Sequence, residues 1–352
     1  MKFPCQIIGV MSGTSLDGVD LALVRFDKVK ENYNYELIKA RTYIYPEEMQ
    51  TQLSQCRALS NDELISLHND WGRFVGELIS DEFLRQNFKV DLIASHGHTV
   101  FHQPKEGITL QIGSIIEMMQ KTGVPTVGDF RLLDVIRGGE GAPLVPIGDR
   151  FLFGAYDCCL NLGGIANISF EKNARRLAYD VAPCNLLLNY LAQRLGLSYD
   201  DGGQIAATGE LNEKLLNQLD HLDFYAADRK PSLGIEYIEK HFYPLLKEGE
   251  LPVEDLLHTC SLHIAKKIAD ATRDCKQVLV TGGGAHNDFL LELFRKEGMN
   301  IVLPDRQTID FKEALIFAFL GLRRIENEVN VLCSVTGASQ DSCSGQLITQ
   351  IP

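Results

Sequence analysis

The fold is decided by residues 7–24, which read IIGVMSGTSLDGVDLALV. Two short runs rich in aliphatic residues flank a turn of Gly, Ser, Thr and Asp, which is the pattern of a β-hairpin. Unpaired backbone N–H groups and hydroxyls at the tip of such a hairpin suit a phosphate group. A single Gly-rich turn is a weak signal, so an ordinary hairpin explains this stretch equally well when it is taken alone.

The rest of the first half predicts a third strand, helices and further strands. A strand is expected at 35–45, an amphipathic helix at 64–78, and strands at 90–94 and 124–131. Polar residues follow the strand at 90–94, and open α/β sheets bind ligands at that end of their strands. The Gly- and Pro-rich segment 138–146 has the composition of a crossover between domains.

The second half repeats this order of elements. Residues 158–170, CCLNLGGIANISF, form a second strand–turn–strand pattern, and a strand ending at Asp180 and a helix from Asn185 follow. A repeat of topology predicts two α/β lobes. We expect residues 1–128 with 330–352 to form the first lobe, onto which the tail packs back, and residues 129–329 to form the second.

Composition limits the classes of partner. The chain of 352 residues is long enough for two domains, and its net charge of -13 argues against nucleic acid or an anionic membrane as a main partner. No run approaches the roughly 20 apolar residues that span a bilayer, and we expect no signal peptide and a cytoplasmic protein. The nine cysteines form no C-x-x-C unit, so most are expected to be reduced and buried.

Three Gly-rich turns that follow strands predict a nucleotide site. They lie near Gly13, Gly163 and Gly283. Two hairpin tips and a third turn can hold a nucleoside triphosphate through backbone N–H groups and hydroxyls. The chain has no Walker A motif, and the turn at 282–287 lacks the last glycine of the dinucleotide fingerprint, so neither standard phosphate loop applies.

Several histidines and carboxylates could complete a ligand site, but each of them also has a simpler structural explanation. His96 and His98 with His102 could ligate a metal, but a polar lining for a hydroxylated ligand such as a sugar is the favoured interpretation. Asp180 precedes a helix, where a carboxylate usually caps the helix or holds a turn, and the alternative is a general base. Glu313 begins a helix and has the same ambiguity, because acidic residues favour first turns.

Motifs along nearly the whole chain carry a family resemblance. They are GVMSGTSLDGVD at 9–20, SHGHTVFH at 95–102, LQIG at 110–113, GDFR at 128–131, GEGAPLVP at 139–146, NLGGIAN at 161–167 and VTGGGAHN at 280–287. With these motifs the chain resembles the anhydro-N-acetylmuramic acid kinase family of the sugar kinase, Hsp70 and actin superfamily. The resemblance implies an α/β fold of two ribonuclease-H-like (actin-like ATPase) lobes with a central ligand cleft.

The resemblance also implies the reaction and the partners. Water attacks the anomeric carbon of 1,6-anhydro-N-acetylmuramic acid, the anhydro bridge opens, and O6 takes the γ-phosphoryl group of ATP. The product, N-acetylmuramic acid 6-phosphate, belongs to cell-wall recycling. The implied cofactors are ATP and Mg²⁺, and the implied assembly is a homodimer.

Residue roles follow from the same resemblance. Asp180 matches the base that deprotonates the water, and Glu313 would help to bind the sugar or to position that water. The first tip has no lysine, so Mg²⁺ must carry much of the phosphate charge, and Asp17 is the candidate metal contact. The implied nucleotide-binding residues are Gly13, Thr14, Ser15, Leu16, Asp17, Gly18, Val19, Asp20, Asn161, Gly163, Gly164, Gly282, Gly283 and Gly284. The implied sugar-binding residues are His96, His98, Thr99, Gln111, Asp129 and Arg131.

Two departures from the family pattern leave alternatives open. The usual Asp-Thr-Gly-Pro-Gly-Asn is here DVAPCN at 180–185, and a Ser-x-Gly-Arg-Glu pattern has Ile235 in place of its arginine. The first change puts a close backbone approach to phosphate or sugar in question, and the second removes a cation. One alternative is a kinase of the same fold that acts on another amino sugar. The other is an inactive nucleotide-binding module, against which the presence of Asp180 argues.

Overall fold

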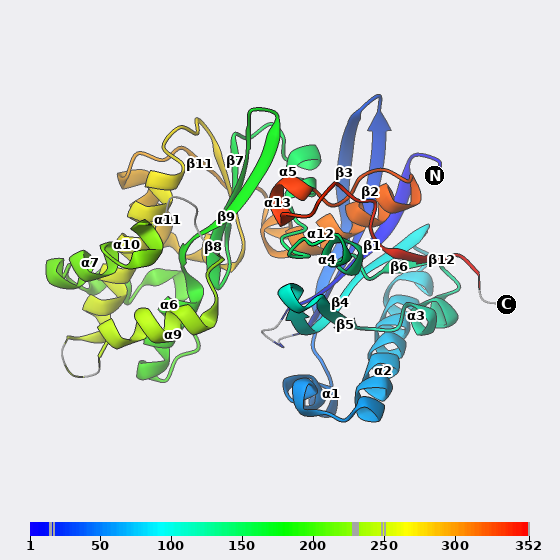
Figure 1. Cartoon of the computed structure of the whole chain (residues 1–352), viewed down its shortest axis with the longest axis horizontal. Coiled ribbons are helices and arrows are strands. Elements are labelled where there is room, and N and C mark those ends of the chain that lie inside the picture. Colours follow the sequence, from blue (N-terminus) through cyan, green and yellow to red (C-terminus); the bar gives the residue numbers. More distant parts are fainter. Residues whose placement is uncertain (14–15, 17, 227–231, 248, 250, 351–352) are drawn as a thin grey trace. The chain divides into compact units, whose positions relative to one another are not determined.

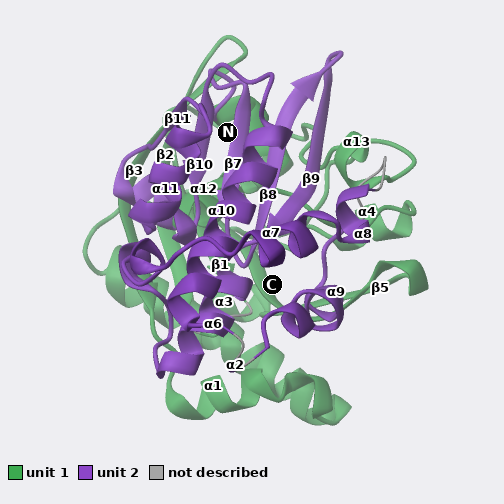
Figure 2. Ribbon diagram, turned by 90° about the vertical axis from the view of Figure 1, so that its left-hand side faces the viewer, with its two compact units in different colours: residues 1–152, 311–352 green, residues 153–310 purple. Residues whose placement is uncertain are grey.

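The computed structural model (Figure 1) describes residues 1–13, 16, 18–226, 232–247, 249 and 251–350. The chain forms two compact units (Figure 2), of which unit 1 comprises residues 1–152 and 311–352, and unit 2 comprises residues 153–310. No helix in the described part of the chain combines the length and the apolar character that crossing a membrane requires.

Unit 1 is built on a mixed seven-stranded sheet. Along the sheet the order is β12-β6-β4-β1-β2-β3, and β5 pairs with β4. The hairpin β1–β2 and the pair β2–β3 are antiparallel, whereas β4 lies parallel to β1 and β6 lies parallel to β4. The strands are β1 (Cys5–Ser12), β2 (Val19–Val29), β3 (Asn32–Tyr43), β4 (Leu92–Gln103), β5 (Ile108–Ile112), β6 (Thr126–Gly128) and β12 (Gln346–Ile348).

One face of this sheet is covered by α2 (Asn61–Ile79) and α3 (Ile115–Thr122), which lie together in Figure 1. Ile8 of β1 shares a buried cluster with Trp71 of α2 and Met118 of α3. A capping box between Ser60 and Glu63 starts α2 and satisfies the backbone N–H groups of these two residues. The remaining helices that lie wholly in this unit are α1 (Glu47–Ser54), α4 (Leu132–Ile136), α5 (Pro146–Leu152) and α13 (Cys333–Thr336).

The other face of the sheet packs against α12 (Arg306–Ile325). Alternate residues of a strand face opposite ways, so Gly9 points away from the cluster that contains Ile8. A Cβ atom built on Gly9 would lie 1.8 Å from the carbonyl oxygen of Ala314, which shows how closely the helix approaches β1. Phe26 and Phe319 continue this contact, with ring centroids 5.8 Å apart.

Unit 2 repeats the topology with five strands in the order β11-β10-β7-β8-β9. As in unit 1, the first three strands in chain order form antiparallel pairs, β7 with β8 and β8 with β9. The next two are parallel, β10 to β7 and β11 to β10. The same connectivity in both units is the ribonuclease-H-like arrangement of actin-like ATPases, as the sequence predicted. The strands are β7 (Cys158–Leu162), β8 (Ile165–Lys172), β9 (Arg175–Pro183), β10 (Val278–Thr281) and β11 (Ile301–Val302).

Helices of unit 2 close one apolar core against this sheet. Leu160 of β7 and Val280 of β10 share that core with Ile264 of α10. The described residues of the segment 197–250, which the sequence leaves irregular, form three short helices and several 3₁₀ turns. The helices are α6 (Asn185–Ala192), α7 (Glu213–Asp220), α8 (Asp223–Ala226), α9 (Ile235–His241), α10 (Val253–Ala271) and α11 (Asp288–Lys296).

The division into units differs from the expected one. Residues 129–152 and 311–329, assigned from the sequence to the second lobe, belong to unit 1. The reason is that α12 packs on the sheet of unit 1, and the chain passes into this unit at Phe311, where the helix is interrupted by a non-helical residue (φ -115°, ψ 16°). The segment 138–146 therefore lies inside unit 1 and is not the crossover. The tail does return to unit 1, where β12 pairs with β6.

Two strands are longer than the sequence suggested. The strand expected at 90–94 continues to Gln103, because its second half pairs with β5, which was not predicted. His96 and His98 therefore lie within β4, where we had placed them after its end. Asp180 likewise lies within β9, three residues before its last residue Pro183. A central ligand cleft remains a prediction.

Candidate functional site

Two of the three Gly-rich turns meet at one end of unit 2. β7 and β10 are adjacent and parallel, with Thr281 opposite Asn161, so both strands end at the same edge of the sheet. The β7–β8 turn carries Gly163 and Gly164, and the turn after β10 carries Gly282 to Gly284. Adjacent parallel strands bring turns together in this way without any special contact. The two Gly-rich turns therefore lie side by side at this end of the sheet.

Glycine is required where these two turns meet. Gly282 has φ 83°, and a Cβ atom there would lie 2.5 Å from the side-chain oxygen of Asn161. At Gly284 a Cβ atom would lie 2.7 Å from that of Leu162. The amide of Asn185 donates to the carbonyl oxygen of Leu162 at 3.0 Å and ties the first turn of α6 to the hairpin. Glycine at these two positions therefore lets the turn after β10 pack directly on the end of β7. The neighbouring Gly164 and Gly283 are exposed, and their backbone without side chains fits the close approach of a phosphate group.

A row of polar side chains crosses the sheet beside these turns. Asn161 pairs with Asn167, and Asn167 pairs with Asp180, so the three side chains share one face of β7, β8 and β9. Their neighbours Leu160 and Val181 point into the core on the other face. Asn167 was not predicted as a site residue. The alternation of inward and outward residues along β8 and β9 was the signal that could have placed it beside Asp180.

The carboxylate of Asp180 is held by a segment far along the chain. Its Oδ2 accepts a hydrogen bond from the backbone N–H of Leu233 at 2.8 Å and one from the hydroxyl of Ser232 at 3.3 Å. Burial raises the pKa of Asp180, and these two donors oppose the rise. A carboxylate with a raised pKa is, in its ionised form, a better proton acceptor than an ordinary aspartate. The capping role considered for Asp180 is not observed, because Cys184 occupies the N-cap position of α6.

The departure DVAPCN is explained by the core. Val181 and Cys184 are fully buried and belong to the apolar cluster of unit 2. The hydroxyl and glycine lost at these positions are therefore replaced by side chains that fill the core and do not line the polar row. Ile235 starts α9 and is 38% exposed, so the missing arginine leaves an apolar residue at the surface.

In unit 1 the start of the first hairpin tip is tied to β4. Ser12, the last residue of β1, exchanges a hydrogen bond with Nδ1 of His98 at 2.8 Å and accepts one from the hydroxyl of Tyr45 at 2.7 Å. Gly13 follows directly. A Cβ atom at Gly18 would lie 2.6 Å from the carbonyl oxygen of Tyr43, so this end of the tip also needs glycine.

The rest of the first tip is only partly described. Thr14, Ser15 and Asp17 lie outside the described residues, and with them the candidate metal contact. Leu16 has φ 60° and its carbonyl oxygen accepts from Gln50. Val19 is buried in the core and Asp20 accepts from Thr42 at 2.6 Å, so these two side chains serve the sheet.

A second cluster of unit 1 joins β4, the segment after β6, and α12. Nε2 of His96 accepts hydrogen bonds from Nε of Arg131 at 3.0 Å and from its terminal nitrogen at 2.8 Å. Nδ1 of His96 bonds the carbonyl oxygen of Gly97 at 2.9 Å, which assigns the ring proton to Nδ1. Burial and the charge of Arg131 hold the pKa of His96 well below its usual value, so this imidazole is neutral.

Glu313 faces the same cluster from α12. Phe317, one turn later, packs on His96 with ring centroids 4.7 Å apart, which places Glu313 on the same side of the helix. Glu313 is accessible to water, but the protein atoms crowded around its carboxyl raise its pKa, and the charge of Arg131 opposes that rise. Burial lowers the pKa of Arg131 to about 10, so the guanidinium remains charged at neutral pH.

The other expected sugar contacts lie on the same sheet. Asp129, just after β6, adopts φ 56° and accepts from the amide of Gln346 at 2.8 Å, while burial raises its pKa. Thr99 and Gln111 are paired across β4 and β5, and the Gln111 amide reaches the hydroxyl of Thr109 at 3.0 Å. All six expected sugar-binding residues therefore belong to unit 1.

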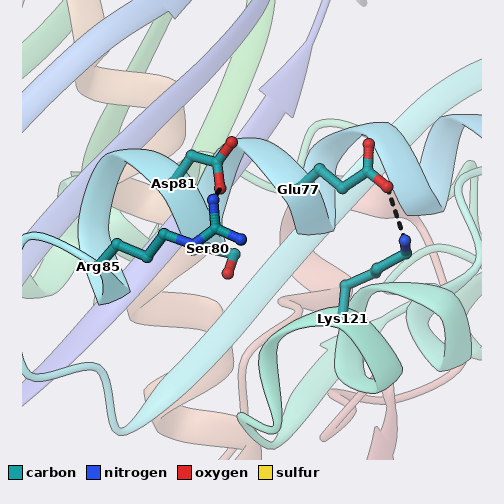
Figure 3. Close-up of a pocket in the computed structure, with 5 residues that line it drawn as sticks. All are labelled: Glu77, Ser80, Asp81, Arg85 and Lys121. Carbon is teal, nitrogen blue, oxygen red and sulfur yellow. Dashed lines mark hydrogen bonds and ion pairs between the residues drawn. The ribbon is translucent and has the colours of Figure 1, made fainter.

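Neither a metal cluster nor the surface hollow beside α2 and α3 adds to the site. Among the residues that the structure describes, no three His, Cys, Asp or Glu side chains are grouped to hold a metal ion. Figure 3 shows a hollow on α2 and α3 that none of the candidate residues lines. Its charges neutralise one another, because Lys121 pairs with Glu77 at 2.6 Å and Arg85 pairs with Asp81 at 2.6 Å.

The chain forms two ribonuclease-H-like units. One carries Gly-rich turns beside an aspartate, and the other carries a His–Arg–Glu cluster. These features define a protein of the actin-like ATPase and sugar kinase class. The model of the anhydro-N-acetylmuramic acid kinase family matches residues 5–350. The chain belongs to this family, and it is a kinase.

Individual relatives match this chain over nearly their full lengths. The anhydro-N-acetylmuramic acid kinase of Saccharophagus degradans is 32% identical over 98% of this chain and 99% of that protein. The one of Vibrio parahaemolyticus is 34% identical over 99% of this chain and 100% of that protein. Among solved structures, the activator of 2-hydroxyisocaproyl-CoA dehydratase from Clostridium difficile has a TM-score of 0.45 at 12% identity, covering 92% of this chain and 96% of that one.

Proposed function

We propose that the protein uses ATP to convert 1,6-anhydro-N-acetylmuramic acid into N-acetylmuramic acid 6-phosphate. Family membership supports this activity, and the held carboxylate of Asp180 is the observation in the structure that carries it. Cytoplasmic location and a homodimeric assembly are parts of the same proposal.

Asp180 is the proposed base. A water molecule that attacks the anomeric carbon gives one proton to the carboxylate, and the C1–O6 bond breaks with its electron pair passing to O6. O6 then forms a bond to the γ-phosphorus, and ADP leaves with the electron pair of the broken P–O bond. Ser232 and Leu233 both donate to Oδ2 of Asp180, so Oδ1 is the oxygen proposed to take the proton.

The glycine-lined turns of unit 2 are proposed to bind the phosphates of ATP. The exposed backbone at Gly164 and Gly283 fits a nucleotide, Gly282 and Gly284 let the second turn pack beside the first, and Gly13 on the first hairpin would supply a further N–H donor. Bound Mg²⁺ would neutralise phosphate charge. Because Asp17 lies outside the described residues, its part in holding Mg²⁺ rests on the sequence alone.

The His–Arg–Glu cluster is proposed to recognise the sugar. Arg131 is charged and fixed by His96 and by the carbonyl oxygen of Gly141 at 2.8 Å, so its position does not depend on a ligand. A fixed guanidinium suits the lactyl carboxylate of the muramic acid. Glu313, accessible and with a raised pKa, would accept a hydrogen bond from a sugar hydroxyl or from the attacking water.

The substrate is tested by comparing sugars directly. The purified protein is incubated with ATP, Mg²⁺ and, in separate reactions, the anhydro sugar, N-acetylmuramic acid, N-acetylglucosamine or N-acetylmannosamine. Phosphorus NMR and mass spectrometry then identify any sugar phosphate. We expect a 6-phosphate from the anhydro sugar and little product from the others. Turnover of an intact amino sugar without turnover of the anhydro sugar would assign the protein to another substrate.

A further inference from the structure

Two cysteines of unit 2 lie together at the end of the sheet opposite to the glycine-lined turns. Cys158 is the first residue of β7 and is fully buried. Cys275 is half-buried in the turn between α10 and β10, where its N–H donates to the carbonyl oxygen of Thr272 at 2.9 Å. They are 117 positions apart in the sequence, so only the fold brings them together.

Hydrogen bonds fix this turn against the start of β7. Oδ2 of Asp157 accepts from the N–H groups of Lys276 and Gln277, both at 2.9 Å. The N–H of Cys158 donates to the carbonyl oxygen of Gln277 at 3.4 Å, and Cys158 pairs with Val278 in the parallel ladder. The residues next to each cysteine are therefore bonded to one another, which limits how far the two thiols can separate.

Cys275 packs against the buried cluster that contains Cys158, and the pKa values of the two thiols shift in opposite directions. Their interaction raises the pKa of Cys158, as does burial, and lowers the pKa of Cys275. The charges of Asp157 and Asp274 and partial burial oppose the lowering at Cys275. Cys275 is also the more accessible of the two, because it is half-buried and Cys158 is fully buried, so Cys275 is the sulfur that a reagent reaches first.

Solvent reaches Cys275 through a surface hollow of about 330 Å³. Cys275 lines this hollow together with three charged residues, Asp270, Arg273 and Glu297. Both signs of charge are present, so the hollow suits a small neutral reagent. Hydrogen peroxide is such a reagent, and it oxidises accessible thiolates in preference to buried thiols.

We propose that Cys158 and Cys275 form a peroxide-oxidisable pair that closes into a disulfide. The Cys275 thiolate attacks one oxygen of the peroxide, the O–O bond breaks, and the second oxygen leaves as water after taking a proton, which gives a sulfenic acid. The sulfur of Cys158 then displaces the hydroxyl of that sulfenic acid, the S–S bond forms, and a second water carries away the thiol proton. Two thiols are thus oxidised and one peroxide is reduced to two waters.

The experiment treats the intact, reduced protein with a small excess of hydrogen peroxide and measures its mass without reductant. We expect a loss of about 2 Da, reversed by dithiothreitol, and a proteolytic digest in which one cross-linked species joins the peptides that contain Cys158 and Cys275. The variant Cys275→Ser should retain the native circular dichroism spectrum and lose the cross-link.

The matched control is Cys343→Ser, which removes a half-buried thiol that contacts the carbonyl oxygen of Arg324 at 3.9 Å. This variant should form the cross-link as the wild type does. Three outcomes would overturn the proposal. They are a protein that keeps all its thiols after peroxide, a Cys275 that gains oxygen atoms without forming a cross-link, and a 2 Da loss that persists in Cys275→Ser.

Discussion

Ser232 contacts the candidate base and offers a way to test its role without removing it. Its hydroxyl donates to Oδ2 of Asp180 and lowers the pKa that burial raises. Ser232→Ala removes that donor, so the pKa of Asp180 should rise. Because the base must be ionised to take a proton, activity falls as the pH drops through this pKa. We expect the acidic limb of kcat/KM against pH to move to higher pH, by up to about one unit.

The conservative variant Ser232→Thr keeps the hydroxyl and serves as the control. Its acidic limb should return to the wild-type position. An Ala variant that loses activity equally at all pH values would show that Ser232 supports the local structure and does not tune Asp180.

At the scale of elements, the contact between β1 and α12 fixes Glu313. Gly9→Ala places a methyl group 1.8 Å from the carbonyl oxygen of Ala314 and 2.9 Å from the backbone nitrogen of Ala318. Backbone atoms of a packed helix do not move aside cheaply, so we expect a loss of about 1–3 kcal/mol in the free energy of unfolding. The start of the helix must also shift, so kcat/KM should fall in protein that is still folded.

Gly337→Ala is the matched control in the same unit. A Cβ atom there meets nothing within 4 Å, and the only cost is the positive φ of 81°. Urea unfolding should show a loss of about 1 kcal/mol for this variant, with kcat/KM unchanged. If the two variants were equally active, the position of α12 on β1 would not matter for the site.

The two sheets show how far the sequence predicts these elements. Both hairpins could be predicted, because the Gly-rich turns at 13–18 and 163–164 separate clear strand patterns. The repeated topology followed from them. The extension of β4 was missed because the polar SHGH at 95–98 interrupts the apolar run. The strand formers Thr99, Val100 and Phe101 that follow were the available signal, and this half of β4 pairs with β5.

Local pattern predicts only part of the candidate site. The glycines stand in Gly-rich turns, whereas the role of Asp180 comes from the family resemblance and stays a prediction. Ser232 and Leu233 lie more than fifty positions from Asp180, and no periodicity connects a loop hydroxyl or a backbone N–H with a distant carboxylate. Likewise, the first residues of α12 belong to unit 2, but the helix from Phe311 onward packs on the sheet of unit 1. No local pattern reveals this packing.

At the scale of the whole molecule, unit 2 is one continuous segment with its own core. The buried cluster that joins its sheet to α6, α10 and α11 contains only residues between Cys158 and Ile309. A segment with a closed core folds independently. We expect residues 153–310, produced alone, to unfold in one cooperative thermal transition.

Residues 1–152 produced alone provide the comparison. This segment lacks α12, which in the intact chain covers Gly9 and Ala94 of its sheet. It should therefore show no cooperative transition and should bind a hydrophobic dye. Cooperative unfolding of 1–152 would mean that α12 is dispensable for unit 1.

The central claim is that Asp180 activates water for attack on the anomeric carbon. It is tested most directly by turnover of 1,6-anhydro-N-acetylmuramic acid with ATP and Mg²⁺ in ¹⁸O-labelled water, in the wild type and in Asp180→Asn. We predict one ¹⁸O atom at the anomeric hydroxyl of the product, none in its phosphate, and a rate at least about 10²-fold lower in the variant. Product without label at the anomeric carbon, or a variant as fast as the wild type, would contradict the account.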